Sequence, residues 1–262
     1  MSQYFKLLAL EVRRFRYVLA GIMVYTLIVE CVAVALDINN HSRLFEWNND
    51  SRHSFAEVIR NTQSGFQLAI VIPVAVLLAY ALLIWYRDWF GRHPFIYRQM
   101  TIPGGRAPLY FSKLTAILLF VFSMVAWQLV LMSVLRIEYV WLTPDAMQEA
   151  VDFTEAMTSN EVFNTFLLPP SFKAFALNYG LGILLILILF TGVLMERSYR
   201  IMGIVAGLIY AALNVTLLIL PTTFGLYLYS SEIWAICLIV FGLEVAAALW
   251  ISLILVSKKV SA

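Results

Sequence analysis

Long apolar runs alternate with polar segments along almost the whole chain. Six of these runs contain about twenty residues each, which is enough to cross a bilayer as a helix at about 1.5 Å per residue. The predicted spans are residues 18–36, 66–86, 114–135, 175–195, 201–220 and 233–256. The pattern therefore predicts an all-α, polytopic membrane protein, with six transmembrane helices in a single transmembrane domain over residues 1–262.

The residues ahead of the first span have a different pattern. In residues 1–17, leucine and aromatic side chains are interleaved with basic ones such as Arg13 and Arg16. This pattern is typical of an amphipathic helix that lies in the membrane interface. The apolar run that follows is too long for a signal-peptide core, and no small-residue cleavage site comes after it. We expect an N-terminal interfacial helix and then a first span.

Two long polar segments are expected on the opposite side of the membrane. Residues 37–64 hold several asparagines and are expected to form a loop. Residues 137–172 form the longest acidic stretch, in which Thr143 can cap a helix that runs to about Met157. We expect this acidic stretch to be a small, partly helical extracytoplasmic loop.

Basic residues are concentrated in the polar segments of one side. The segments at residues 1–17, 87–113, 196–200 and 257–259 carry most of the lysines and arginines. The positive-inside rule therefore places both termini and residues 87–113 in the cytoplasm. With 62% hydrophobic and only 13% charged residues, the composition excludes a soluble globular protein. The formal net charge of +2 gives no reason to expect nucleic acid as a partner.

Residues 87–113 are not built as a flexible connection. Aromatic and aliphatic side chains alternate there with arginines, and a helix can begin on Pro94 but must end before Pro103. Phe95 and Ile96 share one face of that helix. A short amphipathic helix at a membrane requires a surface on which to dock. That surface is either the lipid headgroup layer, where each arginine contributes about 1 kcal/mol, or another protein.

Five polar side chains within the spans are candidates for a translocation path. They are Glu30, Gln128, Asn178, Asn214 and Glu244. The first four lie in the outer half of the membrane, and Glu244 lies nearer the midplane. No lysine or arginine lies within a predicted span, so Glu30 and Glu244 must be protonated, bonded to amides or exposed to a wet cavity. Either they line a transport path or they join helices as neutral acids.

The sequence lacks the common motifs of nucleotide hydrolysis and of hydrolase chemistry. It contains no G-x-x-x-x-G-K-[ST], no H-E-x-x-H and no G-x-S-x-G. Its three histidines, His41, His53 and His93, do not have a metal-binding spacing. We therefore expect no catalytic residue, no metal site and no cofactor on this chain.

The order of these features resembles the integral-membrane permeases of type-2 ABC exporters. The features are six spans with cytoplasmic ends, an amphipathic N-terminus and the sequence PFIYRQMTIPGGRAPLYFSK between the second and third spans. The resemblance covers nearly the whole chain. It implies that residues 87–113 are a cytoplasmic coupling segment that contacts a separate ATPase subunit. Carried over by position, the coupling residues are Phe95, Ile96, Tyr97, Arg98, Met100, Pro103 and Arg106.

The resemblance also implies cofactors and partners. ATP and Mg would bind to the ATPase subunit, and the permease would pair with a second copy of itself or with a related permease in a bacterial cell membrane. The sequence does not name the exported substrate, since a peptide antibiotic, a drug, a lipid and a glycan are all compatible with an apolar dimer interface. The chain departs from many relatives in that its larger outer segment lies at residues 137–172 and not between the fifth and sixth spans.

Three classes of function can be compared on these features. A permease subunit of an ATP-driven exporter, with no enzymatic activity of its own, is the one we expect. A proton-coupled secondary transporter that uses Glu30 and Glu244 is the alternative, although the two halves of the chain show no inverted repeat. An intramembrane enzyme is disfavoured, because the sequence offers neither a nucleophile with its base nor a metal cluster.

Overall fold

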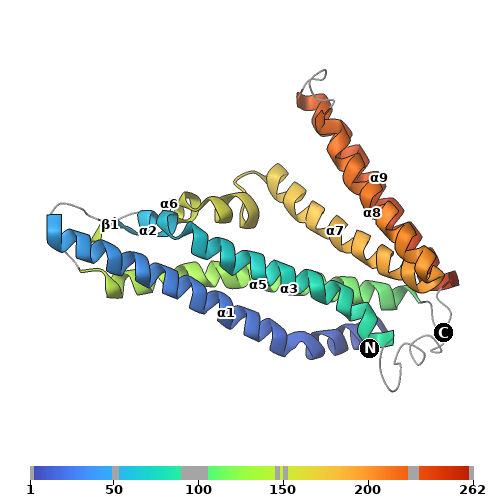
Figure 1. The fold of residues 1–262 in the computed structure, drawn as a ribbon, viewed down its shortest axis with the longest axis horizontal. Coiled ribbons are helices and arrows are strands. Elements are labelled where there is room, and N and C mark those ends of the chain that lie inside the picture. Colours follow the sequence, from blue (N-terminus) through green and yellow to red (C-terminus); the bar gives the residue numbers. More distant parts are fainter. Residues whose placement is uncertain are drawn as a thin grey trace. The chain divides into compact units, whose positions relative to one another are not determined.

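The computed structural model is almost entirely helical over the residues that it describes (Figure 1). The described residues are 3–48, 53–89, 106–144, 148–149, 153–223 and 230–259. Among them, 6 helices are long and apolar enough to cross a membrane, as the sequence predicted. These helices are α1 (Gln3–Asn48), α3 (Gln63–Trp89), α5 (Ala107–Leu142), α7 (Phe172–Tyr199), α8 (Ile201–Thr223) and α9 (Ser230–Ile254).

The first helix is longer than its apolar run. α1 passes without a break through residues 3–17, where a separate interfacial helix was expected, and continues into the expected loop at residues 37–64. Ile38 is buried in the core of the second unit, so packing favours continuation of the helix, and polar side chains there bond to its own carbonyl groups. His41 Nδ1 lies 3.1 Å from the carbonyl oxygen of Asp37, and Ser42 donates to the carbonyl oxygen of Asn39 at 3.0 Å. Polar composition alone therefore does not end this helix.

Short elements connect the long helices at one end. The two-residue strands β1 (His53–Ser54) and β2 (Gln148–Glu149) pair in parallel, and α2 (Phe55–Asn61) packs against α6 (Phe153–Ser159). Ser54 begins α2 with a capping box, because its hydroxyl accepts from the backbone N–H of Glu57 at 3.2 Å while the Glu57 carboxylate accepts from the Ser54 N–H. The local sequence thus fixes where α2 starts.

The acidic segment differs from its prediction in detail. α5 continues to Leu142 because its buried face, which includes Leu135 and Tyr139, extends past the expected end of the span. Thr143 lies at the C-terminal end of α5 and does not cap a helix. Asn160 caps the next segment, where its side-chain oxygen accepts from two backbone N–H groups before the π-helical turn η1 (Phe163–Leu167).

The chain divides into two compact units, which are described separately. The first unit comprises Met1–Glu11, Leu78–Ile117 and Gly180–Ala262, and the second comprises Val12–Leu77 and Leu118–Tyr179. The long helices α1, α3, α5 and α7 each contribute residues to both units. In the second unit, a buried core joins α1, α2, α3, α5, α6 and η1. Its largest members include Phe55, Ile59, Phe66, Leu135, Tyr139 and Phe163.

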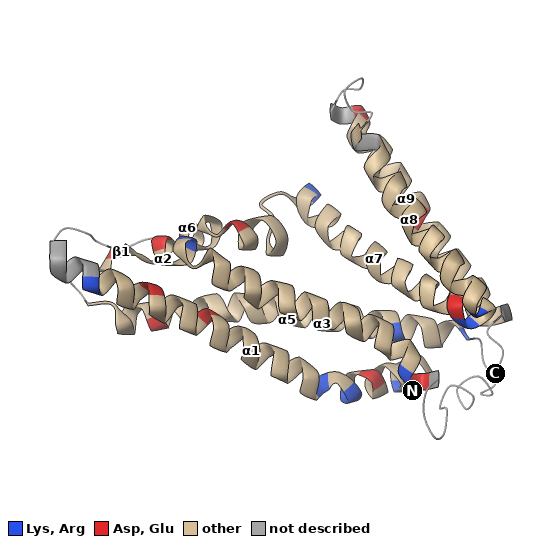
Figure 2. Cartoon of the chain, viewed as in Figure 1, with Lys and Arg blue, Asp and Glu red and all other residues tan. Residues whose placement is uncertain are grey.

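Aromatic packing dominates the interior of the first unit. The ring of Trp85 in α3 meets that of Phe190 in α7 edge-on at 5.5 Å, and Phe190 meets Tyr110 of α5 at 5.7 Å. Figure 2 shows that charged residues lie mainly near the ends of the long helices. Large apolar side chains such as Leu208 on α8 and Trp250 on α9 are exposed, as expected of surfaces that contact lipid.

Gly65 of α3 offers a direct test of the packing between α1 and α3. A Cβ atom added at Gly65 would lie 2.6 Å from the Cβ of Ala33 in α1. We expect Gly65→Ala to lower the free energy of unfolding by about 1–3 kcal/mol through overpacking. The measurement is the melting temperature of the full-length protein in mild detergent. Gly21→Ala is the matched control, because an added Cβ meets nothing within 4 Å there. Equal melting temperatures for the two variants would contradict the close packing.

Candidate functional site

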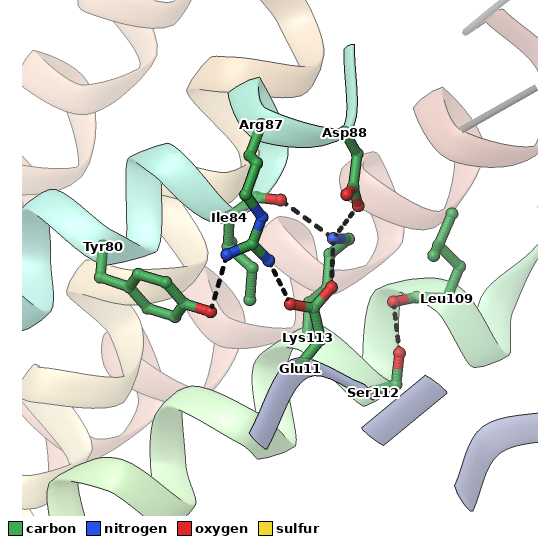
Figure 3. A network of polar contacts seen from close by, with 8 residues as sticks. All are labelled: Glu11, Tyr80, Ile84, Arg87, Asp88, Leu109, Ser112 and Lys113. Carbon is green, nitrogen blue, oxygen red and sulfur yellow. Dashed lines mark hydrogen bonds and ion pairs between the residues drawn. The ribbon is translucent and has the colours of Figure 1, made fainter. Parts of the chain in front are cut away.

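Four charged side chains form a buried group that joins α1, α3 and α5 (Figure 3). We call this group the charge cluster. It consists of Glu11 of α1, Arg87 and Asp88 near the end of α3, and Lys113 near the start of α5. Glu11, Asp88 and Lys113 are 2%, 2% and 0% exposed. Two carboxylates face two cationic groups, so the charge cluster has no net formal charge.

Lys113 lies at the centre of the charge cluster. Its Nζ atom donates to Glu11 Oε1 at 3.0 Å, to the backbone carbonyl oxygen of Ile84 at 3.0 Å and to Asp88 Oδ2. An ammonium group has three N–H donors, so all three are used. The same Nζ lies 5.3 Å from the ring centroid of Trp85, which adds a cation–π contact. These contacts compensate for the removal of the ammonium group from water.

Arg87 completes the charge cluster at its more accessible edge. Its Nη2 atom donates to Glu11 Oε2 at 2.5 Å, and its Nη1 atom donates to the Tyr80 hydroxyl at 3.5 Å. Glu11 therefore binds one basic side chain on each carboxylate oxygen. Because removing one partner of a buried ion pair leaves the other uncompensated, such a group resists separation of its helices. The end of α3 and the start of α5 are thus both fastened to α1.

Arg106 fastens the same region to the C-terminal end of the chain. Its Nη1 atom donates to the carbonyl oxygen of Val256 at 3.2 Å and to that of Ser257 at 3.5 Å. Carbonyl groups in the last turn of a helix lack partners within the helix, and an arginine is a suitable donor for them. Arg106 is the coupling residue that the structure describes. The other predicted coupling residues, Phe95, Ile96, Tyr97, Arg98, Met100 and Pro103, lie outside the described residues.

Sequence reasoning identified the basic members of the charge cluster but missed its acidic ones. Arg87 and Lys113 were expected as charges of the segment at residues 87–113, whereas Glu11 and Asp88 were not singled out. One signal was available in the sequence. Glu11 and Asp88 are carboxylates within segments that otherwise carry basic charge, so an ion pair between segments could have been suspected.

The structure joins two of the predicted intramembrane residues directly. Gln128 of α5 donates through Nε2 to Glu30 Oε1 of α1, and Glu30 is 0% exposed. Near this pair, the indole N–H of Trp127 donates to the carbonyl oxygen of Met23 at 3.0 Å and to the Thr26 hydroxyl at 3.1 Å. These bonds link α1 to α5 within the second unit. They fit the interpretation of Glu30 and Gln128 as contacts that hold two spans together.

The remaining intramembrane candidates have other neighbours. Asn178 donates to the carbonyl oxygen of Thr165 at 2.6 Å, and Asn214 donates to that of Tyr210, on its own helix, at 2.7 Å. Glu244 is 5% exposed, and neither of its carboxylate oxygens has a hydrogen-bond partner among the described residues. The predicted translocation residues therefore do not form one continuous group within either unit.

In the described part of the chain, no three His, Cys, Asp or Glu side chains are grouped so that they could hold a metal ion. Comparison of the chain with protein-family models, with curated proteins and with solved structures found no match.

Lys113 provides a test of the charge cluster. Replacing it by methionine leaves Glu11 and Asp88 buried without the ammonium group. Loss of one partner of a buried ion pair costs about 3–5 kcal/mol, and we expect the free energy of unfolding to fall by that amount. The measurement is unfolding of the purified full-length protein in mixed micelles with increasing SDS, followed by tryptophan fluorescence.

Lys173→Met is the matched control, because Lys173 is exposed at the start of α7 and should contribute less than about 0.5 kcal/mol. Adding Asp88→Asn to Lys113→Met should recover part of the loss, since it removes the buried negative charge of Asp88, whereas Glu11 keeps its ion pair with Arg87. Wild-type stability of Lys113→Met would show that the charge cluster does not hold the helix ends.

The pair of Glu30 and Gln128 can be examined by a double-mutant cycle. We expect Glu30→Ala and Gln128→Ala to show a coupling of about 0.5–1.7 kcal/mol, the range found for hydrogen bonds between membrane helices. Unfolding in SDS gives all four stabilities. The control cycle combines Glu30→Ala with Gln67→Ala, because Gln67 is exposed on α3, and its coupling should stay below about 0.5 kcal/mol. Equal couplings in the two cycles would argue against a direct bond.

Proposed function

We propose that this chain is the permease subunit of an ATP-driven exporter, and that residues 87–113 couple it to a separate ATPase subunit. The observation that carries the proposal is the fastening of that segment at its base. Its two ends are bound to each other, because Asp88 pairs with Lys113 within the charge cluster. Nearer its C-terminal end, Arg106 is bound to the carbonyl groups of Val256 and Ser257.

Such fastening is what a coupling segment requires. A segment that receives a displacement from a partner transmits it only if its junctions with the spans are stiff. Here the charge cluster holds together the ends of α1, α3 and α5, and Arg106 adds the C-terminal turn that follows α9. A displacement of the segment would therefore move four helix ends together. A loop that only lies on lipid headgroups has no need of fully buried charges at its base.

Close packing extends these connections toward α7. Lys113 contacts the ring of Trp85, and Trp85 packs edge-on against Phe190 of α7. Closely packed side chains transmit displacement because they have little free volume into which to relax. Movement at the base of the segment would thus also bear on α7, within the same compact unit.

The charge distribution supports an orientation in which residues 87–113 face the cytoplasm. Basic residues are frequent near both termini and in residues 87–113, and the positive-inside rule assigns such segments to the cytoplasm, where ATP is available. The chain has no phosphate-binding loop of its own, so ATP and Mg would bind the partner ATPase. A bacterial cell membrane, with a second identical or related permease beside this one, completes the proposed assembly.

The proposal is tested by purifying the full-length protein in mild detergent from its native host. We expect a soluble ATPase with a phosphate-binding loop to co-purify in stoichiometric amount, identified by mass spectrometry. Phe95→Glu combined with Arg98→Glu should reduce its recovery at least tenfold, because the variant places negative charge on the coupling segment. Unchanged recovery with that variant would remove residues 87–113 from the interface.

Arg60→Glu is the matched control for that experiment. It reverses one charge on α2, an exposed position on the side predicted to lie away from the ATPase, and should leave recovery unchanged. A chain that purifies without any ATPase would contradict the proposal. Proton-coupled transport through Glu30 and Glu244 would then be the function to examine.

A further inference from the structure

A second polar group lies in the same compact unit as the charge cluster. We call it the Glu244 cluster. Its members come from α5, α7, α8 and α9, and they are Tyr110, Thr191, Tyr210, Asn214, Glu244 and Ser252. None of them takes part in the charge cluster, and none is a predicted coupling residue. Tyr110, Thr191, Asn214, Glu244 and Ser252 are all buried.

Contacts between helices bring these residues into one region. The hydroxyl groups of Thr191 and Ser252 are 2.8 Å apart, which fixes α7 against α9. Glu244 lies two turns before Ser252 on the same face of α9, and both are buried. Ser252 also lies beside Tyr110.

α8 contributes Tyr210 and Asn214 to the Glu244 cluster. Tyr210 lies beside Thr191 and Asn214, and within electrostatic range of Glu244. On the same helix, Gly207 approaches Gly192 of α7 so closely that an added Cβ would lie 3.3 Å from its Cα atom. Small residues at this crossing allow the two backbones to come close and bring the polar face of α8 toward α7.

The Glu244 carboxylate is not satisfied by the protein. Neither of its oxygens has a hydrogen-bond partner among the described residues, whereas the hydroxyl group of Tyr110 lies beside Ser252 and that of Tyr210 lies beside Asn214 and Thr191. Buried polar groups are normally bonded, and a carboxylate with both oxygens unbonded requires an explanation. Glu30 differs, because Gln128 bonds one of its two carboxylate oxygens.

The charges of the surrounding helices indicate the charge of the missing partner. α8 and α9 contain no lysine or arginine, and the lysine of α5 in this unit, Lys113, already uses its three donors on the charge cluster. Arg197 of α7 lies over the ring of Tyr86, at 4.9 Å from the ring centroid. The Glu244 cluster is therefore rich in oxygen and poor in positive charge. A single carboxylate among neutral hydroxyl groups suits a monovalent cation better than a divalent metal ion.

We propose that the Glu244 cluster binds the cationic group of an amphiphilic substrate, an ammonium or similar organic cation carried on an apolar body. Tyr210, within electrostatic range of the carboxylate, offers an aromatic ring, and an aromatic ring with a carboxylate attracts organic cations. The exposed apolar surfaces of α8 and α9 would accommodate the apolar body. This inference rests on the proposed export function and specifies the chemistry of its substrate.

The position of the site on α5 connects it with coupling. Tyr110 of the Glu244 cluster and Lys113 of the charge cluster are three residues apart on one helix, so they lie on neighbouring parts of the same face. A movement of the start of α5 shifts both groups. Release of the cation and displacement of the coupling segment can thus occur in the same step.

The test uses two probes of equal shape and opposite charge. Radiolabelled tetraphenylphosphonium and tetraphenylborate are equilibrated with the full-length protein in nanodiscs, without any ATPase. We expect saturable binding of the phosphonium cation only, weakened at least tenfold in Glu244→Gln. Glu232→Gln, an exposed position at the start of α9, is the matched control and should bind as wild type. Equal binding in Glu244→Gln, saturable binding of the borate anion, or no saturable binding of either would overturn the proposal.

A second measurement needs no variant and so does not depend on the folding of one. Dicyclohexylcarbodiimide modifies carboxylic acids within membranes, and mass spectrometry locates the product. Bound tetraphenylphosphonium should lower modification of Glu244 at least fivefold and leave that of Glu30 unchanged. Equal modification of Glu244 with and without the probe would contradict the site. Binding of tetraphenylphosphonium without a co-purifying ATPase would contradict the export function and leave this site supported. A co-purifying ATPase without tetraphenylphosphonium binding would contradict this site and leave the export function supported.

Discussion

The buried ammonium group of Lys113 determines how the helix ends around it are arranged. A cation removed from water must recover its lost hydration through bonds to the protein, and Lys113 does so with three acceptors supplied by α1 and α3. Glu11 in turn requires Arg87 for its second oxygen. None of these groups can leave without exposing another to an apolar interior. The end of α3 and the start of α5 are therefore held rigidly against α1.

The two intramembrane glutamates show how the same residue type serves different purposes. Glu30 accepts a bond from Gln128 across two spans, so its polarity is used for packing. Glu244 has no such donor among the described residues, although it is also buried, and Tyr210 lies within electrostatic range of it. A protein that keeps an unsatisfied carboxylate in its interior accepts a cost in stability. That cost is understandable if a ligand supplies the missing partner.

The number of spans could be predicted because a bilayer demands long, uninterrupted apolar helices. The helix ends could not, because the polar residues that suggested a loop after residue 36 bond back onto α1, as His41 does. Only the basic half of the charge cluster could be predicted from the sequence, because the pairing between Glu11 and Lys113 depends on helix packing and leaves no local sequence pattern. The same holds for the contrast between Glu30 and Glu244. Their residue type made both glutamates candidates for the translocation path, and only the neighbouring side chains distinguish their roles.

The bond between Glu11 and Lys113 also has a consequence for biosynthesis. The two residues are 102 positions apart, and a ribosome that adds about 5–20 residues per second needs about 5–20 seconds to pass from one to the other. During that interval the first helix has been made, but its carboxylate still lacks the ammonium group that will neutralise it. The first span can therefore reach its final packing only after the third has emerged, whichever insertion machinery handles the chain.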